Sequence, residues 1–458
     1  MTIMAKRFLP ALLLAAASAA GAAPLDLAQA WSGAQTHDRE LAVARLAHEA
    51  SRTRADQAQA LGRPQVFASG TAGLAQQSSR MEGAQFSAPG LGTSGDVGFA
   101  TSVTGGAALR WSVMAQHALV NAERDANRAQ LGLATQMGEL AWQGARTDLM
   151  LRTAQRYYDL ALAEERVRLL QAQAQAVGRA ATEAQDRFDL GAAPITDTHE
   201  ARAALAELQA RLAAAHADVR VRQQALADST GVAEPNARLP RAATAADAGS
   251  TTRLDTWQQR APEQGVAVRL QQLALDLAQH DARKLSRGAS TTVDLVAQAG
   301  QDRLWGPGAY GSASQRGTQA LVGVQVRVPL YTGGLRDARE REALLLAERA
   351  RAQLDDTRQQ VARQAHALRQ GLLAEHERLA ALTQALAASQ ARLDATRLGR
   401  EVGDRTTLDL LNAENHLAQT RLAHAEARVA WHLRQLQLAA LADVLDDGVW
   451  QQANAGLE

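Results

Sequence analysis

The chain has 458 residues, no cysteine, 3% aromatic residues, and 49 basic against 48 acidic residues. The absence of cysteine excludes a disulfide scaffold and thiolate chemistry, and we expect no lipid anchor because a lipobox requires that residue. The net charge of +1 argues against nucleic acid as a partner, since phosphate binding requires a concentrated basic surface. Abundant Ala, Leu, Gln, Arg and Glu favour long, thin, solvated helices.

Residues 1–22 have the pattern of a secretory signal peptide. Lys6 and Arg7 are followed by an apolar run over residues 9–20 and by an A-x-A cleavage motif at 20–22. The apolar run is shorter than the roughly 20 residues that a membrane-spanning helix needs. We therefore expect an exported chain without a transmembrane helix.

Hydrophobic periodicity predicts the same elements in each half of the chain: a helix, two strands joined by a polar loop, and a hairpin of two long helices. In the first half, residues 23–231, these are a helix over 26–61, strands at about 64–75 and 97–113, and a helical hairpin at about 115–230. An irregular linker rich in Ala, Pro, Asp and Thr is expected over 232–261.

The second half, residues 262–445, repeats this order. It predicts a helix over 262–287, strands at about 290–300 and 319–329, and a helical hairpin at about 335–444, followed by a tail over 446–458. The turns of the two hairpins also match in sequence: Gly191 corresponds to Gly403, and Asp197 corresponds to Asp409. The chain is therefore expected to contain an internal two-fold repeat.

The predicted strands are about ten residues long, apolar on one face and polar on the other, which is typical of outer-membrane barrels. Four such strands cannot stand alone in lipid, because an open sheet leaves its edges without hydrogen bonds. Two copies would give eight strands around a filled interior, whereas three would give twelve strands and a lumen. A trimer is thus the smaller assembly that forms a pore.

The expected barrel assigns roles to five residues. Arg110, Asp294 and Arg327 lie on polar faces and would line the pore, with both arginines expected at equivalent positions just before their strands end. Trp111 and Tyr331 are expected at strand ends, where they would contribute to an aromatic girdle.

Three motifs carry a resemblance to a known family: Gly191-Ala-Ala-Pro-Ile-Thr-Asp197, Gly403-Asp-Arg-Thr-Thr-Leu-Asp-Leu-Leu-Asn-Ala413, and Val328-Pro-Leu-Tyr-Thr-Gly-Gly334. On these the chain resembles the TolC family of outer-membrane efflux and secretion channels. The resemblance implies an α+β membrane protein: a homotrimer whose 12-stranded outer-membrane β-barrel, with four strands per chain, continues into a long periplasmic α-helical coiled-coil barrel. The linker and the tail would form an equatorial belt.

The resemblance also implies a gate where the hairpins turn. Arg405 would bond Thr196 or Asp197, and one Asp409 from each of three subunits would form an acidic ring that attracts cations. Simple helix capping is the alternative role for Asp409, because Thr406 and Asp409 have capping-box spacing.

Two positions depart from the family pattern. Asn412 stands where a second ring carboxylate is expected, so the ring would be weaker. Arg400 replaces a tyrosine, and an ion pair between Arg400 and Asp197 is expected to take over its link.

The expected function is that of a passive exit duct in the outer membrane of a Gram-negative bacterium. It would receive drugs, other small molecules or a type I-secreted protein from an inner-membrane RND or ABC transporter through a periplasmic adaptor. No catalytic residues, cofactor or metal site are expected; His416, His424 and His432 recur every eight residues, whereas helical metal ligands usually lie four apart. A periplasmic coiled-coil scaffold or adaptor without a pore is the alternative.

Overall fold

The computed structural model describes residues 25–90, 92–242, 251–286, 291–308 and 311–457, so the expected signal peptide lies outside the described residues. The chain divides into two compact units, each made of several segments. The first unit comprises Met1–Arg45, Gln143–Val266 and Arg358–Glu458. The second unit comprises Leu46–Trp142 and Ala267–Thr357.

The second unit contains one antiparallel sheet in which the strands pair in chain order. Its members are β1 (Gln65–Ala88), β2 (Gly92–Val120), β3 (Thr292–Gly308) and β4 (Gly311–Arg327). Because the order is β1-β2-β3-β4, one side of β1 and one side of β4 have no strand partner among the described residues.

All four strands are longer than the sequence predicted. The Gly-, Ser- and Gln-rich segments that were expected to be loops, 76–95 and 301–318, lie mostly within strands. The pairing of β2 with β3 ends at Val103 and Gly308, whereas β1 and β2 continue together to Ala88 and Gly92. The loop prediction was wrong because backbone hydrogen bonds to neighbouring strands hold these polar segments in the sheet, despite their low intrinsic strand propensity.

Helices of the second unit pack beside one another through polar as well as apolar contacts. This unit contains most of α2 (Arg39–Ala60) and most of α7 (Val266–Ser286). It also contains the first parts of the two long helices that follow β2 and β4 in the chain. His48 stacks on Trp142 with ring centroids 5.6 Å apart, and its Nε2 lies 2.7 Å from Glu139.

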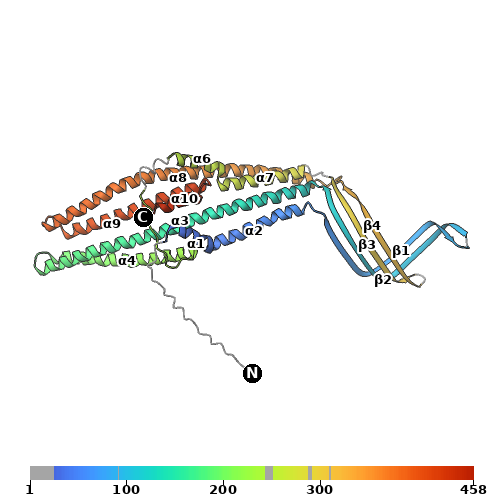
Figure 1. Cartoon of the computed structure of the whole chain (residues 1–458), viewed down its shortest axis with the longest axis horizontal. Coiled ribbons are helices and arrows are strands. Elements are labelled where there is room, and N and C mark those ends of the chain that lie inside the picture. Colours follow the sequence, from blue (N-terminus) through green and yellow to red (C-terminus); the bar gives the residue numbers. More distant parts are fainter. Residues whose placement is uncertain (1–24, 91, 243–250, 287–290, 309–310, 458) are drawn as a thin grey trace, which may run out of the picture. The chain divides into compact units, whose positions relative to one another are not determined.

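The first unit contains most of two helical hairpins, including both of their turns. One consists of α3 (Ala122–Asp189) and α4 (Ile195–Thr230), the other of α8 (Leu335–Glu401) and α9 (Thr407–Leu441). Figure 1 shows the two hairpins lying side by side within this unit. A shared core near the turns joins all four helices, through Val177, Ala180, Ala181, Ala201, Leu208, Leu393, Leu410, Leu411, Ala413 and Leu417.

Three short helices complete the first unit: α1 (Leu27–His37), α6 (Thr251–Gln264) and α10 (Asp447–Ala455). The linker was expected to be irregular, yet it contains most of α6. The tail contains α10, and an isolated β-bridge between Pro240 and Leu457 joins linker and tail. Within the described part of the chain, no helix is both long and apolar enough to cross a membrane.

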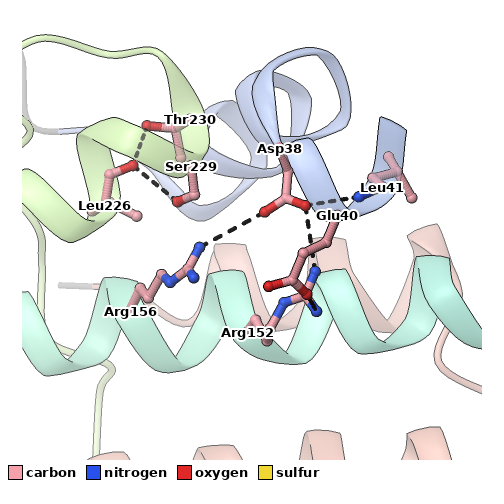
Figure 2. A network of polar contacts seen from close by, with 8 residues as sticks. All are labelled: Asp38, Glu40, Leu41, Arg152, Arg156, Leu226, Ser229 and Thr230. Atoms are coloured by element: carbon pink, nitrogen blue, oxygen red, sulfur yellow. Dashed lines mark hydrogen bonds and ion pairs between the residues drawn. The ribbon is translucent and has the colours of Figure 1, made fainter. Parts of the chain in front are cut away.

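The first predicted helix is two helices, α1 and α2, divided at Asp38. This residue leaves the helical conformation with φ −68° and ψ 122°, and its carboxylate accepts a hydrogen bond from the backbone N–H of Leu41 at 2.9 Å. Figure 2 shows the same carboxylate facing Arg152 and Arg156 of α3, at 3.4 and 3.8 Å. Arg152 also pairs with Glu40. One buried carboxylate therefore starts α2 and anchors this bend to α3.

Candidate functional site

One face of the sheet is apolar and open. Trp111 of β2 lies opposite Gly70 of β1 and Gln301 of β3, and its side chain is 47% exposed. The strand register places further exposed apolar side chains on the same face: Val66, Leu74, Leu109, Val113, Leu295, Trp305, Val322, Val324 and Val326. An exposed apolar face of this extent is unusual for a protein surface in water and indicates a missing apolar neighbour.

The opposite face carries the three residues predicted to line a pore. Arg110 faces Asp302 of β3 and Thr71 of β1, and Asp294 of β3 faces Gln325 of β4. Asp294 and Asp302 are an even number of residues apart in a strand without register shifts, so their side chains share a face.

Arg327 lies two residues beyond Gln325 and therefore shares this polar face. Both arginines are exposed. Asp294 is only 4% exposed, and its Oδ1 has no hydrogen-bond partner.

Two details of the strand prediction were wrong. Because β2 continues to Val120, Arg110 and Trp111 lie in the middle of their strand rather than near its end, whereas Arg327 is the last residue of β4. The alternation of residues 97–113 predicts Val103 and Ala107 on one face, but a register shift between them places them on opposite faces. An extra residue in one strand reverses the side-chain direction beyond it. Tyr331 follows β4 and is 89% exposed.

The two hairpin turns share a glycine in the left-handed conformation. Gly191 has φ 71° and Gly403 has φ 85°, which a residue with a Cβ adopts only with strain. After the first turn, Pro194 precedes α4 without a side-chain cap. After the second turn, Thr406 caps α9 in a capping box with Asp409. The matching sequences of the two turns thus adopt the same backbone geometry at their glycines, whereas the helices that follow the turns have different N-terminal caps.

The capping role weighed for Asp409 is present in the structure. Its backbone N–H donates to the Thr406 hydroxyl, and its carboxylate accepts hydrogen bonds from the Thr406 N–H and O–H at 3.0 Å. These two hydrogen bonds, with a smaller contribution from Arg405, hold the pKa of Asp409 below its ordinary value. The lowered pKa keeps this half-buried carboxylate ionised at neutral pH.

A direct hydrogen bond joins the two turns. Thr407 Oγ1 donates to Asp197 Oδ2 at 3.3 Å. The expected partner of Asp197 was Arg405, but no hydrogen bond or ion pair among the described residues joins Arg405 to Asp197 or to Thr196. Arg405 instead lies over Gly399, where an added Cβ would fall 2.8 Å from the Arg405 Cγ.

Arg400 also has a different partner from the expected one. Its side chain is 8% exposed, and its Nη2 lies 2.8 Å from Glu183 of α3, so the predicted ion pair with Asp197 was wrong. Asn412 has an exposed side chain in the first turns of α9. Thr407 and Glu183 were missed because pairing across two hairpins depends on how helices pack, which neither turn motif encodes.

The arrangement combines a two-faced sheet with polar links between helical turns. No group of three His, Asp or Glu side chains gathers to hold a metal ion in the ranges that the structure describes.

Comparison with known proteins agrees with this architecture. The model of the outer membrane efflux protein family matches residues 31–232 and 257–443. Outer membrane protein TolC of Vibrio cholerae is 25% identical over 310 residues, which cover 68% of this chain and 71% of that protein. The proteases secretion protein PrtF of Dickeya chrysanthemi is 28% identical over 198 residues, which cover 42% of this chain and 41% of that protein.

Among solved structures, CusC superposes with a TM-score of 0.72 at 14% identity, over 91% of this chain and 92% of that one. CusC is described as a protein that forms a transmembrane channel. At this identity the likeness shows the fold, a mixture of long helices and a four-stranded sheet. The two ranges matched by the family model correspond to the two halves of the chain. This chain therefore belongs to the outer membrane efflux protein family.

Proposed function

We propose that three copies of this chain form the exit duct of a tripartite export system in the outer membrane. The observation that carries the proposal is the sheet, whose apolar face is open and whose edge strands, β1 and β4, each have an unpaired side. Pairing β4 of one copy with β1 of the next satisfies both edges in lipid. Four strands from each of three copies give a 12-stranded barrel wide enough for a lumen.

In this barrel the polar face lines the lumen and the apolar face contacts lipid. Arg110, Asp294 and Arg327 share the polar face, while Trp111 belongs to the apolar one. The barrel continues into a periplasmic coiled-coil barrel. Tyr331, which follows β4 and is exposed, acts as an aromatic anchor at a membrane interface.

The hairpin turns form the periplasmic gate. Thr407 and Asp197 link the two hairpins, and Arg400 with Glu183 adds an ion pair between α8 and α3. Breaking these links frees the hairpins to untwist. Thr196, Arg405 and Asn412 belong to the same turn regions of the gate. Three ionised Asp409 carboxylates converge on the axis and favour cations.

Transport through this duct is passive, so an RND or ABC transporter in the inner membrane supplies the energy through a periplasmic adaptor. PrtF is named for protease secretion, which supports a secreted protein as cargo. The same conduit would also serve small molecules.

The test is conductance across a planar bilayer after purification in detergent. Because Thr407→Val and Arg400→Gln each remove one link between the hairpins, both variants are expected to conduct more than the wild type. Arg421→Gln should match the wild type, because Arg421 is exposed and, among the described residues, bonds only Gln390 within its own hairpin. The absence of conductance in all four proteins would refute the channel and favour a coiled-coil scaffold without a pore. Equal conductance in all four would refute the gate alone.

A further inference from the structure

A basic pocket lies in the first unit, between α3 and the turn that joins α8 to α9. It is an open hollow of about 860 Å³. Four arginines contribute to its lining, together with three carboxylates: Arg179, Arg187, Arg397, Arg400, Glu183, Glu401 and Glu414. The lining therefore carries one more positive than negative charge.

Arg400 is the buried cation of this pocket. Its side chain is 8% exposed, yet neither its Nε nor its Nη2 has an acceptor in hydrogen-bond geometry. The contact with Glu183 is an ion pair at 2.8 Å without a well-aligned hydrogen bond. A buried guanidinium whose donors are unsatisfied stabilises any acceptor that can reach it.

The other arginines differ in how far they are neutralised. Arg397 pairs with Glu414 of α9, whereas Arg179 and Arg187, both on α3, have no ion pair or side-chain hydrogen bond within the described parts of the chain. Two unpaired cations thus border the hollow beside the largely buried side chain of Arg400.

We propose that this pocket binds a small oxyanion, a phosphate or a carboxylate, held by Arg400 together with Arg179 and Arg187. The planar guanidinium donates two parallel N–H groups to such an anion, a geometry that an ammonium group cannot offer. The site involves neither Asp197 nor Asp409, and binding does not require the chain to be a channel.

Bound anion and Glu183 compete for the same guanidinium. The carboxylates of the pocket therefore lower its affinity for the anion, and removing one of them should strengthen anion binding. The same competition means that an anion weakens the link between α8 and α3, so occupancy would be coupled to the packing of the hairpin ends.

The test is isothermal titration of the full-length protein in detergent with inorganic phosphate and, separately, with acetate, at constant ionic strength. Arg400→Gln and Arg187→Gln should each weaken phosphate binding by about tenfold or more, because each removes a charge-assisted contact. Glu183→Gln should tighten binding several-fold. Arg421→Gln is the matched control, an arginine on α9 outside the pocket, and should bind as the wild type does.

Each outcome of the titrations supports or overturns the proposed anion site. No heat of binding with either anion in the wild type and in Glu183→Gln would overturn the proposal, as would equal affinities in Arg400→Gln and the control. Binding of phosphate alone would identify the ligand as a free phosphate-like anion, whereas binding of both anions would extend it to carboxylates. Circular dichroism checks that each variant keeps its helices, and a gain in affinity in Glu183→Gln cannot come from misfolding.

Discussion

Asp38 offers a prediction whose magnitude follows from its contacts. Its side chain is 6% exposed, caps α2 through Leu41, and lies near two arginines whose side chains are each 34% exposed. Loss of the cap costs about 1 kcal/mol, and each partly screened ion pair contributes about 0.5–1 kcal/mol. Asp38→Ala should therefore lower the free energy of unfolding by about 2–3 kcal/mol.

Asp38→Asn separates the two contributions. The amide oxygen can still accept the Leu41 N–H, because Asn is as good an N-cap as Asp, so only the charge is lost. This variant should lose about 1–2 kcal/mol. The larger loss expected for an unpaired buried charge does not apply, because both arginines reach solvent and Arg152 keeps Glu40.

The assay is guanidinium denaturation followed by far-ultraviolet circular dichroism, at one protein and detergent concentration, because assembly shifts apparent stability. Amide hydrogen exchange in the first turn of α2 gives a local readout of the cap. Asp38→Ala combined with Arg156→Gln should show a coupling of about 0.5–1 kcal/mol. Equal losses in the Ala and Asn variants would refute the capping argument, and losses under about 0.5 kcal/mol in both would refute the network.

Three further predictions concern other sites. Burial raises the pKa of Glu164, so its protonated form stabilises the folded state; this contribution to the free energy of unfolding is fully present below the ordinary pKa of 4.5 and is lost as pH rises through the folded pKa. Glu164→Gln should therefore raise the melting temperature at pH 7 but not at pH 4. Gly33→Ala should destabilise the packing of α1 on α4 by about 1–3 kcal/mol in the same denaturation assay, because its Cβ would fall 2.4 Å from the backbone oxygen of Thr230. Thr406→Ala should raise the pKa of Asp409 toward its ordinary value and speed hydrogen exchange at the start of α9, and unchanged exchange there would contradict the capping box.

The sequence by itself determined the order of strand pairs and long helical hairpins, the two-fold repeat and the family. These follow from local signals: helical and alternating periodicity, the glycines at 191 and 403, and the turn motifs around them. Strand lengths were underestimated because the segments after Ala75 and Gly300 are rich in residues that disfavour strands in isolation. Only their partners across the sheet make them strands.

The tertiary structure decided which side chains pair between the two hairpins. Asp197 was correctly expected to link the hairpins, but its donor is Thr407, and Arg400 reaches Glu183 instead. Such pairs depend on the rotation of each helix about its axis, which the shared core around Leu393 and Leu410 fixes. A sequence motif specifies which side chains are available at a turn, whereas the packing of four helices selects which of them meet.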